Sequence, residues 1–136
     1  MKAFSIESAF FVIVSIFFSL FSNYICFMLY FIEVVLPLAV SKTFTYQVSE
    51  AEFNYIQLGM RVAVPFGKTK IYTALVVDKN NIPPQLYQAK EIHQILDEQP
   101  VVNLFQIAHW KWIASYYMCS LGEVYRSALP SGYILE

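Results

Sequence analysis

A short run at positions 67–69, Gly-Lys-Thr, has the residue types that bind phosphate in nucleotide-binding loops. The full motif also requires a glycine five residues before Gly67, and that position is occupied by Val62. Pro65 lies between the two positions and lacks one of the backbone N–H donors that would bind phosphate. The sequence therefore excludes a P-loop nucleotide site here.

The other residues that could do chemistry are isolated from one another. His93 falls in an alternating segment and His109 in a helical one, so we expect ordinary surface or packed histidines. Asp97 and Glu98 are adjacent, and an extended backbone points adjacent side chains to opposite faces, which disfavours an acid–base pair. The two cysteines have no metal-ligand spacing and form no disulfide framework. We predict no catalytic residue and no metal site.

Charge and hydropathy divide the chain of 136 residues into two parts. Hydrophobic residues make up 57% of it, and nine basic and ten acidic residues leave a net charge of −1. Positions 8–32 contain no charged residue, whereas the remainder has the composition of an ordinary globular domain. This balance excludes a protein that coats DNA through a broad basic surface, but allows a small pocket with one or two basic groups.

The apolar leader has three interpretations. As a helix, residues 9–32 would span ~36 Å, more than the ~30 Å of a bilayer core, so a membrane segment is one of them. A signal peptide is another. The third is translation from a start upstream of the true one, with Met28 as the natural start. We expect an apolar helical leader at 1–27 and a single domain at 28–136.

The elements that position the candidate residues follow from periodicity. Alternation and β-branched residues predict strands at 31–36, 43–48, 61–65, 70–78 and 92–96. In the second of these, Phe44, Tyr46 and Val48 share one face. A capping box at 49–52 predicts one helical turn at most.

After residue 101 the apolar spacing changes to three and four, which predicts a helix, with a second at 123–129. Trp110, Trp112, Tyr116 and Tyr117 follow this spacing, so we expect them to pack in the core. The predicted fold is mainly β: a small antiparallel β-barrel or curled sheet followed by one or two C-terminal helices.

Four short strings occur in order along residues 34–130. They are VVLP at 34–37 with KTFTY at 42–46; GMRVAVPFGK at 59–68; AK at 89–90 leading into ILDE at 95–98; and WIASYY at 112–117 followed by LGEV and ALP. Together they resemble the amino-terminal region of primosomal protein N-prime, the PriA family of replication-restart DNA helicases. The resemblance implies a module that recognises the 3′ end of the nascent strand at forked or 3′-tailed DNA.

The same resemblance assigns site residues. Those implied to bind the DNA 3′ end are Phe44, Thr45, Gly67 and Lys90, with Lys42 and Lys68 as possible phosphate contacts. An aromatic face can stack on a terminal base, and lysine supplies a point charge for phosphate. Many members of the family carry Asp where this chain has Thr45. By pattern alone Phe44 would be a core residue, Gly67 a turn residue and Lys90 a solvated lysine.

The resemblance also bounds the function. The strings stop before the winged-helix and helicase domains, so we expect no enzymatic activity and no cofactor in this chain; ATP and zinc are implied only for the absent domains. Single-stranded DNA-binding protein and other primosome proteins are implied partners, and the cytoplasm is the implied location. The alternatives are a small membrane-anchored protein with a soluble β domain, held through residues 9–32, and a truncated gene product without function.

Overall fold

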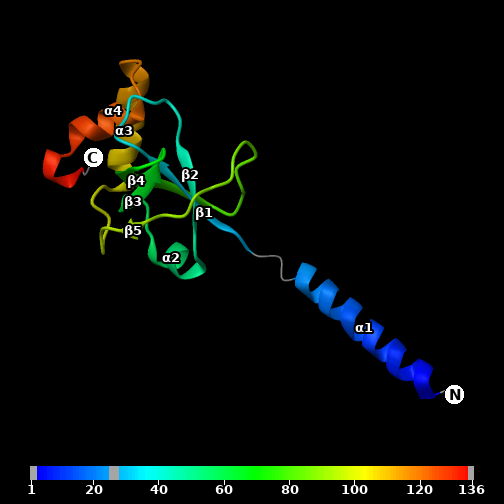
Figure 1. The fold of residues 1–136 in the computed structure, drawn as a ribbon. Helices are drawn as coiled ribbons and strands as arrows, with labels where there is room; N and C mark the ends of the chain where they lie inside the picture. Colours follow the sequence, from blue (N-terminus) through cyan, green and yellow to red (C-terminus); the bar gives the residue numbers. More distant parts are fainter. Residues whose placement is uncertain (1–2, 25–27, 135–136) are drawn as a thin grey trace.

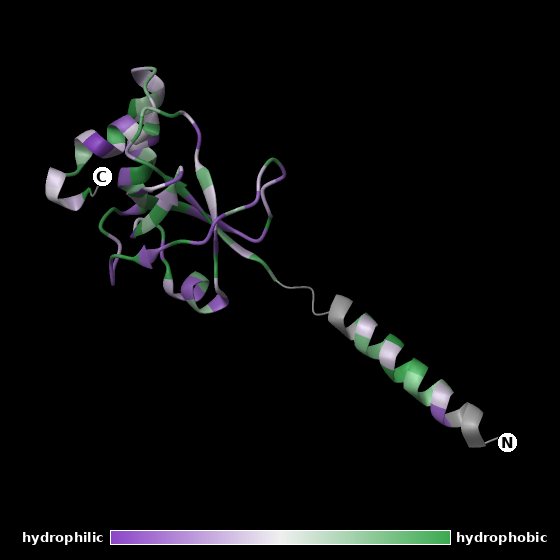
Figure 2. Cartoon of the chain, in the orientation of Figure 1, coloured by the Kyte–Doolittle hydropathy of each residue, from purple (hydrophilic) through white to green (hydrophobic). Residues whose placement is uncertain are grey.

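The computed structural model describes residues 3–24 and 28–134, and Figure 1 shows their arrangement. Helix α1 (Ala3–Tyr24) comes first and stands apart from the sheet in this view. Its described side chains, at 7–20, are exposed, and Figure 2 shows how apolar most of them are. Cys26 lies outside the described residues. Within residues 3–24 and 28–134, no helix combines the length and the hydropathy needed to cross a bilayer.

One antiparallel sheet forms the body of the domain, as the sequence predicts. Its strands are β1 (Tyr30–Val35), β2 (Phe44–Val48), β3 (Arg61–Phe66), β4 (Lys70–Asn80) and β5 (Gln94–Ile95). They are ordered β2-β1-β4-β3-β5, and the register of β1 against β4 shifts between Glu33 and Val34. Such a bulge bends a strand and increases its twist, which contributes to the curl of the sheet.

Three helices follow local capping signals. Helix α2 (Glu50–Tyr55) starts at the capping box of Ser49 and Glu52, but it is longer than the single turn predicted. Helices α3 (Leu104–Tyr116) and α4 (Leu121–Ala128) have their own capping boxes, at Asn103 and Ser120. In α4 the Ser120 cap starts the helix two residues earlier than predicted, because its side chain accepts from the Glu123 N–H. A 3-10 turn (Ser131–Tyr133) completes the described chain.

The sheet is buried on both faces, which gives the domain two apolar clusters. One face packs around Ile32, Val34, Tyr46, Val64 and Val76 inside the curl. The other face packs against α3 and α4 through a second set of side chains, which includes Val35, Leu75, Val77, Ile107, Trp110 and Tyr125. Strand β4 contributes alternate residues to each cluster, which explains why its sequence is a continuous run of apolar residues at 74–77. The expected mainly β fold with C-terminal helices is confirmed.

The segment that precedes and includes β5 closes most of the curl. The Gln47 N–H of β2 donates to the Lys90 carbonyl at 2.8 Å, and Gln47 and Glu91 form a parallel bridge. The His93 N–H then donates to the Ala63 carbonyl of β3 at 2.8 Å. Residues 90–95 thus connect β2 to β3, and we call this segment the seam. Because the seam crosses from one strand to another, the predicted strand at 92–96 shrinks to two residues.

The expectation that four aromatic residues of α3 pack in the core is wrong for three of them. Trp110 is buried beside Tyr125, but Trp112, Tyr116 and Tyr117 are 57%, 66% and 70% exposed. Trp112 instead stacks on Tyr116, with ring centroids 5.2 Å apart. The helix is apolar on several faces, so spacings of three and four continue around it and do not identify the buried face.

Candidate nucleic-acid interface

The implied 3′-end residues come together at the seam. A hollow of about 310 Å³ there is lined by Phe44, Thr45, Tyr46, Pro65, Phe66, Gly67, Tyr87, Gln88 and Lys90. These residues come from β2, from the end of β3 and the turn that follows it, and from the start of the seam with the loop before it. All four residues that the family strings select therefore lie in one hollow, although they are up to 46 positions apart in the sequence (90 − 44).

Aromatic rings form one wall of the hollow. Phe44 packs edge-on against Phe66, with centroids 5.1 Å apart and an interplanar angle of 75°. Phe66 in turn packs against Tyr72 at 5.9 Å. Both phenylalanines are only half-buried, because Phe44 lies at the start of β2 and Phe66 at the end of β3. The wall therefore leaves apolar ring surface open to a planar ligand, as base stacking requires.

Two tyrosine hydroxyls are fixed by the backbone around the hollow. The Tyr46 hydroxyl donates to the Pro65 carbonyl at 2.9 Å, which connects β2 to β3. The Tyr87 hydroxyl oxygen accepts from the Thr45 N–H at 3.0 Å, which holds the loop against the edge of β2. Burial, together with the nearby Tyr87, raises the pKa of Tyr46 to about 12, so this phenol keeps its proton to a higher pH than an ordinary tyrosine does.

Lys90 and Gly67 form the polar end. The Lys90 ammonium donates to the Gly67 carbonyl at 3.0 Å, and the Lys90 carbonyl accepts from Gln47. Gly67 has a φ of +72°, which a side chain would strain, and a Cβ there would meet no atom within 4 Å. The turn therefore presents open backbone next to a single positive charge. Among the described lining residues, Lys90 is the one that carries charge.

The other predicted residues lie outside this hollow. Lys42 and Lys68 are exposed and do not line it, but each is within two positions of a residue that does. His93 and His109 are exposed, as expected. Asp97 is bound by Arg61 through two side-chain contacts, of 2.9 and 2.5 Å, so it serves structure.

Sequence reasoning missed five of the lining residues: Tyr46, Pro65, Phe66, Tyr87 and Gln88. Phe66 belongs to the PFGK string, so attention to its position in the turn could have included it. Tyr87 and Gln88 lie in an irregular loop, where periodicity gives no signal, and only the fold brings them to β2.

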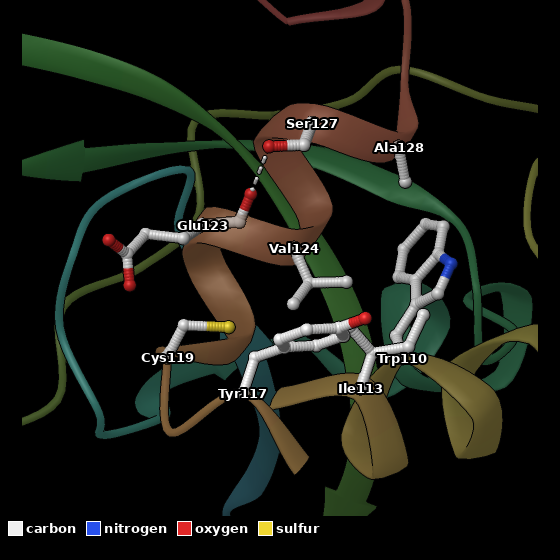
Figure 3. A pocket seen from close by; sticks show the side chains of 8 residues that line it. All are labelled: Trp110, Ile113, Tyr117, Cys119, Glu123, Val124, Ser127 and Ala128. Atoms are coloured by element: carbon white, nitrogen blue, oxygen red, sulfur yellow. Dashed lines mark hydrogen bonds between the residues drawn. The ribbon is translucent and has the colours of Figure 1, made fainter. Parts of the chain in front are cut away.

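A second hollow, of about 350 Å³, lies between α3 and α4 (Figure 3). Two of its polar side chains, Glu123 and Ser127, are already paired within the chain. Ser127 donates to the Glu123 carbonyl, and the Glu123 carboxylate accepts from the Ser120 N–H and hydroxyl. These contacts lower the pKa of Glu123 and tie it to the start of α4. The exposed lining of this hollow is mainly apolar.

A curled antiparallel sheet with a small, aromatic-walled hollow at its seam is the architecture of a compact ligand-binding β module. Comparison with known proteins makes this class specific, because residues 33–130 match the sequence model of the PriA 3′DNA-binding domain (3′BD). The chain belongs to this family and is a DNA-binding module of the replication-restart type.

The relatives with similar sequences are named replication restart protein PriA. The replication restart protein PriA of Haemophilus influenzae is 37% identical over 105 residues, and that of Treponema pallidum is 27% identical over 104 residues. These matches include 73% and 74% of this chain, respectively. The chain spans only 13% and 16% of the length of these two relatives, so it corresponds to a small part of each.

Proposed function

We propose that this module captures the 3′ end of a DNA strand in the hollow at the seam, at forked or 3′-tailed DNA. The observation that carries the proposal is the convergence of Phe44, Thr45, Gly67 and Lys90, from three separate segments, on one small hollow. Its volume is at the lower end of the range for ligand pockets, which suits one terminal nucleotide better than a longer stretch of strand.

Each of these residues makes a different contact with the end of the strand in this proposal. The exposed ring surface of Phe44 and Phe66 stacks on the terminal base without reading its identity, which contributes about 1–3 kcal/mol. The open turn at Gly67 allows a sugar to approach the backbone closely. Lys90 places its ammonium, which donates to Gly67 with one of three N–H bonds, beside a terminal phosphate group.

Lys42 and Lys68 contact the phosphates that precede the terminal nucleotide in this proposal. Both are exposed beside the hollow, where a strand leaving it would pass. Each contact to single-stranded DNA contributes about 0.7 to the slope of log affinity against log salt. Lys42→Ala and Lys68→Ala should each reduce that slope by about this amount. The measurement is fluorescence anisotropy of labelled DNA in a salt titration from about 50 to about 200 mM. An unchanged slope would remove that lysine from the interface.

End capture itself is tested with DNA that has or lacks an end. We expect the full chain to bind a linear single strand with a free 3′ end more tightly, by about tenfold, than a circular strand of the same sequence, because stacking of one base supplies about that much. Equal affinities would contradict end capture.

The site is tested with a matched pair of variants. Lys90→Ala should weaken binding to the linear strand by about fivefold to tenfold, because one charge-assisted contact is lost. Lys111→Ala removes the same charge from the exposed surface of α3 and should change affinity by less than about twofold. Equal effects of the two substitutions would show only general charge attraction and would exclude the assignment of Lys90.

In a full-length protein of this family the module would present the strand end to the helicase domains that use ATP and contain zinc. Forked DNA, single-stranded DNA-binding protein and the other primosome proteins are the proposed partners there, and the cytoplasm the proposed location. For this chain by itself we expect no ATP hydrolysis above background, with or without DNA. A purified sample that hydrolyses ATP would overturn that expectation.

A further inference from the structure

The hydrogen bonds around the hollow leave donors available, and this bears on which end it accepts. The Tyr46 proton is used on the Pro65 carbonyl. The Tyr87 oxygen instead accepts from the Thr45 N–H, and among the described residues no acceptor is recorded for its own proton. The Tyr87 side chain is 48% exposed, so that proton is within reach of a bound ligand.

Lys90 adds two further donors. Its ammonium gives one N–H to the Gly67 carbonyl, which leaves two for a ligand. The backbone of Lys90 is held by Gln47 and its ammonium by the Gly67 carbonyl, so the two hydrogen bonds together place the charge at the hollow. Gln88 and Thr45 add a neutral amide and a neutral hydroxyl to the described lining.

The described lining contains no carboxylate. A terminal hydroxyl is neutral, whereas a terminal phosphate adds about −1.5 to −2 of charge and three acceptor oxygens at pH 7. An acidic side chain in the hollow would repel that phosphate, but position 45 carries a threonine in this chain. Both the charge of Lys90 and the surplus of donors therefore favour a phosphorylated end.

We propose that the hollow accepts a DNA strand ending in a 3′-phosphate at least as well as one ending in a 3′-hydroxyl. The Lys90 ammonium and the Tyr87 hydroxyl are the two donors to the terminal phosphate. Thr45 permits this because it is neutral, and its N–H orients the Tyr87 hydroxyl. The proposal rests on end capture by this hollow, and it names the chemistry of the captured end.

The test uses the full chain and two linear strands of one sequence, ending in 3′-hydroxyl or 3′-phosphate, with the circular strand as reference. We expect the phosphate end to bind with equal or up to about tenfold higher affinity. A phosphate end that binds about fivefold or more weakly overturns this inference, while tight binding of both linear strands over the circle leaves end capture standing. Equal affinity for all three strands would instead contradict end capture.

Two substitutions locate the effect. Tyr87→Phe keeps the ring and removes the hydroxyl, so affinity for the phosphate end should fall by about fivefold and affinity for the hydroxyl end by less than about twofold. Equal losses for both ends would exclude Tyr87 as a donor to the phosphate.

Thr45→Asp tests the charge in the opposite direction. Adding a carboxylate to the lining should weaken binding of the phosphate end by about tenfold or more, and leave the hydroxyl end within about threefold. Thr45→Asn, which is of similar size but neutral, is the control and should keep the original order. If Thr45→Asp leaves the ratio of the two affinities unchanged, position 45 does not set the end preference and the inference fails.

Discussion

At the scale of single residues, the two hydroxyls in the hollow have different duties. Tyr46 is 4% exposed and donates to Pro65, so it holds β2 to β3. Tyr87 is half-exposed and holds the loop to β2 through its oxygen. Tyr46 therefore has a structural role, whereas Tyr87 combines a structural contact with the proposed contact to the ligand.

Tyr46 predicts a loss of stability at alkaline pH. Because burial raises its pKa from 10 to about 12, the native state keeps this proton above pH 10, where the unfolded chain loses it. The contribution is therefore complete below pH 10 and is lost as pH rises from 10 to about 12, at no more than about 1.4 kcal/mol per pH unit. Urea unfolding at several pH values should show Tyr46→Phe with a shallower decline than the parent chain.

Tyr46→Phe should also cost about 1 kcal/mol at neutral pH, because the Pro65 carbonyl loses its donor. The exposed Tyr116→Phe is the control, and its stability at neutral pH should match the parent. A decline between pH 10 and 12 that is identical with and without the Tyr46 hydroxyl would contradict the assignment.

At the scale of elements, the fit of α4 against the chain that leaves β1 depends on one small residue. Gly122 lies in the first turn of α4, where a Cβ would come within 2.1 Å of the Leu38 carbonyl oxygen and 2.3 Å of that of Leu36. Both oxygens belong to the backbone and cannot rotate away. The glycine of the LGEV string therefore has a packing role, and the helix closes over the outer face of the sheet because of it.

Gly122→Ala should destabilise the domain by about 3 kcal/mol, the upper end of what overpacking costs, because the helix must move away from residues 36–38. The loss is read from the free energy of unfolding in urea. Gly132→Ala provides the matched control, since a Cβ there meets no atom within 4 Å and the change should stay within about 0.5 kcal/mol. Similar stabilities for the two variants would show that α4 shifts without cost.

A second element-scale contact joins β3 to the chain beyond the seam. Arg61 binds Asp97 with two side-chain contacts and also donates to the Tyr133 carbonyl at 2.8 Å. The hydrogen bonds to Asp97 raise the pKa of Arg61 above its ordinary value. Asp97→Asn should cost about 2–4 kcal/mol in urea unfolding, because a partly buried guanidinium loses its counter-charge. Glu98→Gln, an exposed neighbour, should be neutral.

At the scale of the whole molecule, the sheet buries its apolar surface in its own curl and against α3 and α4, whereas the described side chains of α1 take no part in this packing. The described side chains of α1 are exposed, whereas the sheet carries an apolar cluster on each face. We propose that residues 28–136 are the folding unit.

Residues 28–136 should therefore unfold in one cooperative transition, with a melting temperature within a few degrees of the full chain, on the order of experimental scatter for small domains. Circular dichroism at near- and far-ultraviolet wavelengths measures both levels of structure. A broad, non-cooperative transition would favour a remnant without a stable fold, and a much lower melting temperature would show that α1 supports the domain.

Local patterns predict much of this architecture. Alternation locates β2, β3 and β4 because one or both faces of each strand are buried, and the capping box at Ser49 locates the start of α2 because its contacts are local. The seam and the buried face of α3 were missed. The seam is held by hydrogen bonds between residues 30 or more positions apart (63 to 93 and 47 to 90), and α3 is apolar on several faces.

The candidate site was predictable only in part and only through the family strings. By themselves, Phe44 resembles any core residue of a strand, Gly67 any turn glycine and Lys90 any surface lysine. Tyr87 could not be found, because its role arises from a loop that the fold brings to Thr45. These residues differ from other strand, turn and surface residues of the same type because the fold brings them together. Periodicity in the sequence carries no information on that proximity.

The hydrogen bond from the Gln47 N–H to the Lys90 carbonyl couples the closure of the curled sheet to the binding of a ligand. Lys90 offers its side chain to the end of a DNA strand, and its carbonyl holds the seam to β2. A ligand held by Lys90 would thereby slow the transient parting of the seam from β2, and the Gln47 amide would exchange its hydrogen with solvent more slowly. That single amide would then report occupancy of the hollow, without any label on the DNA.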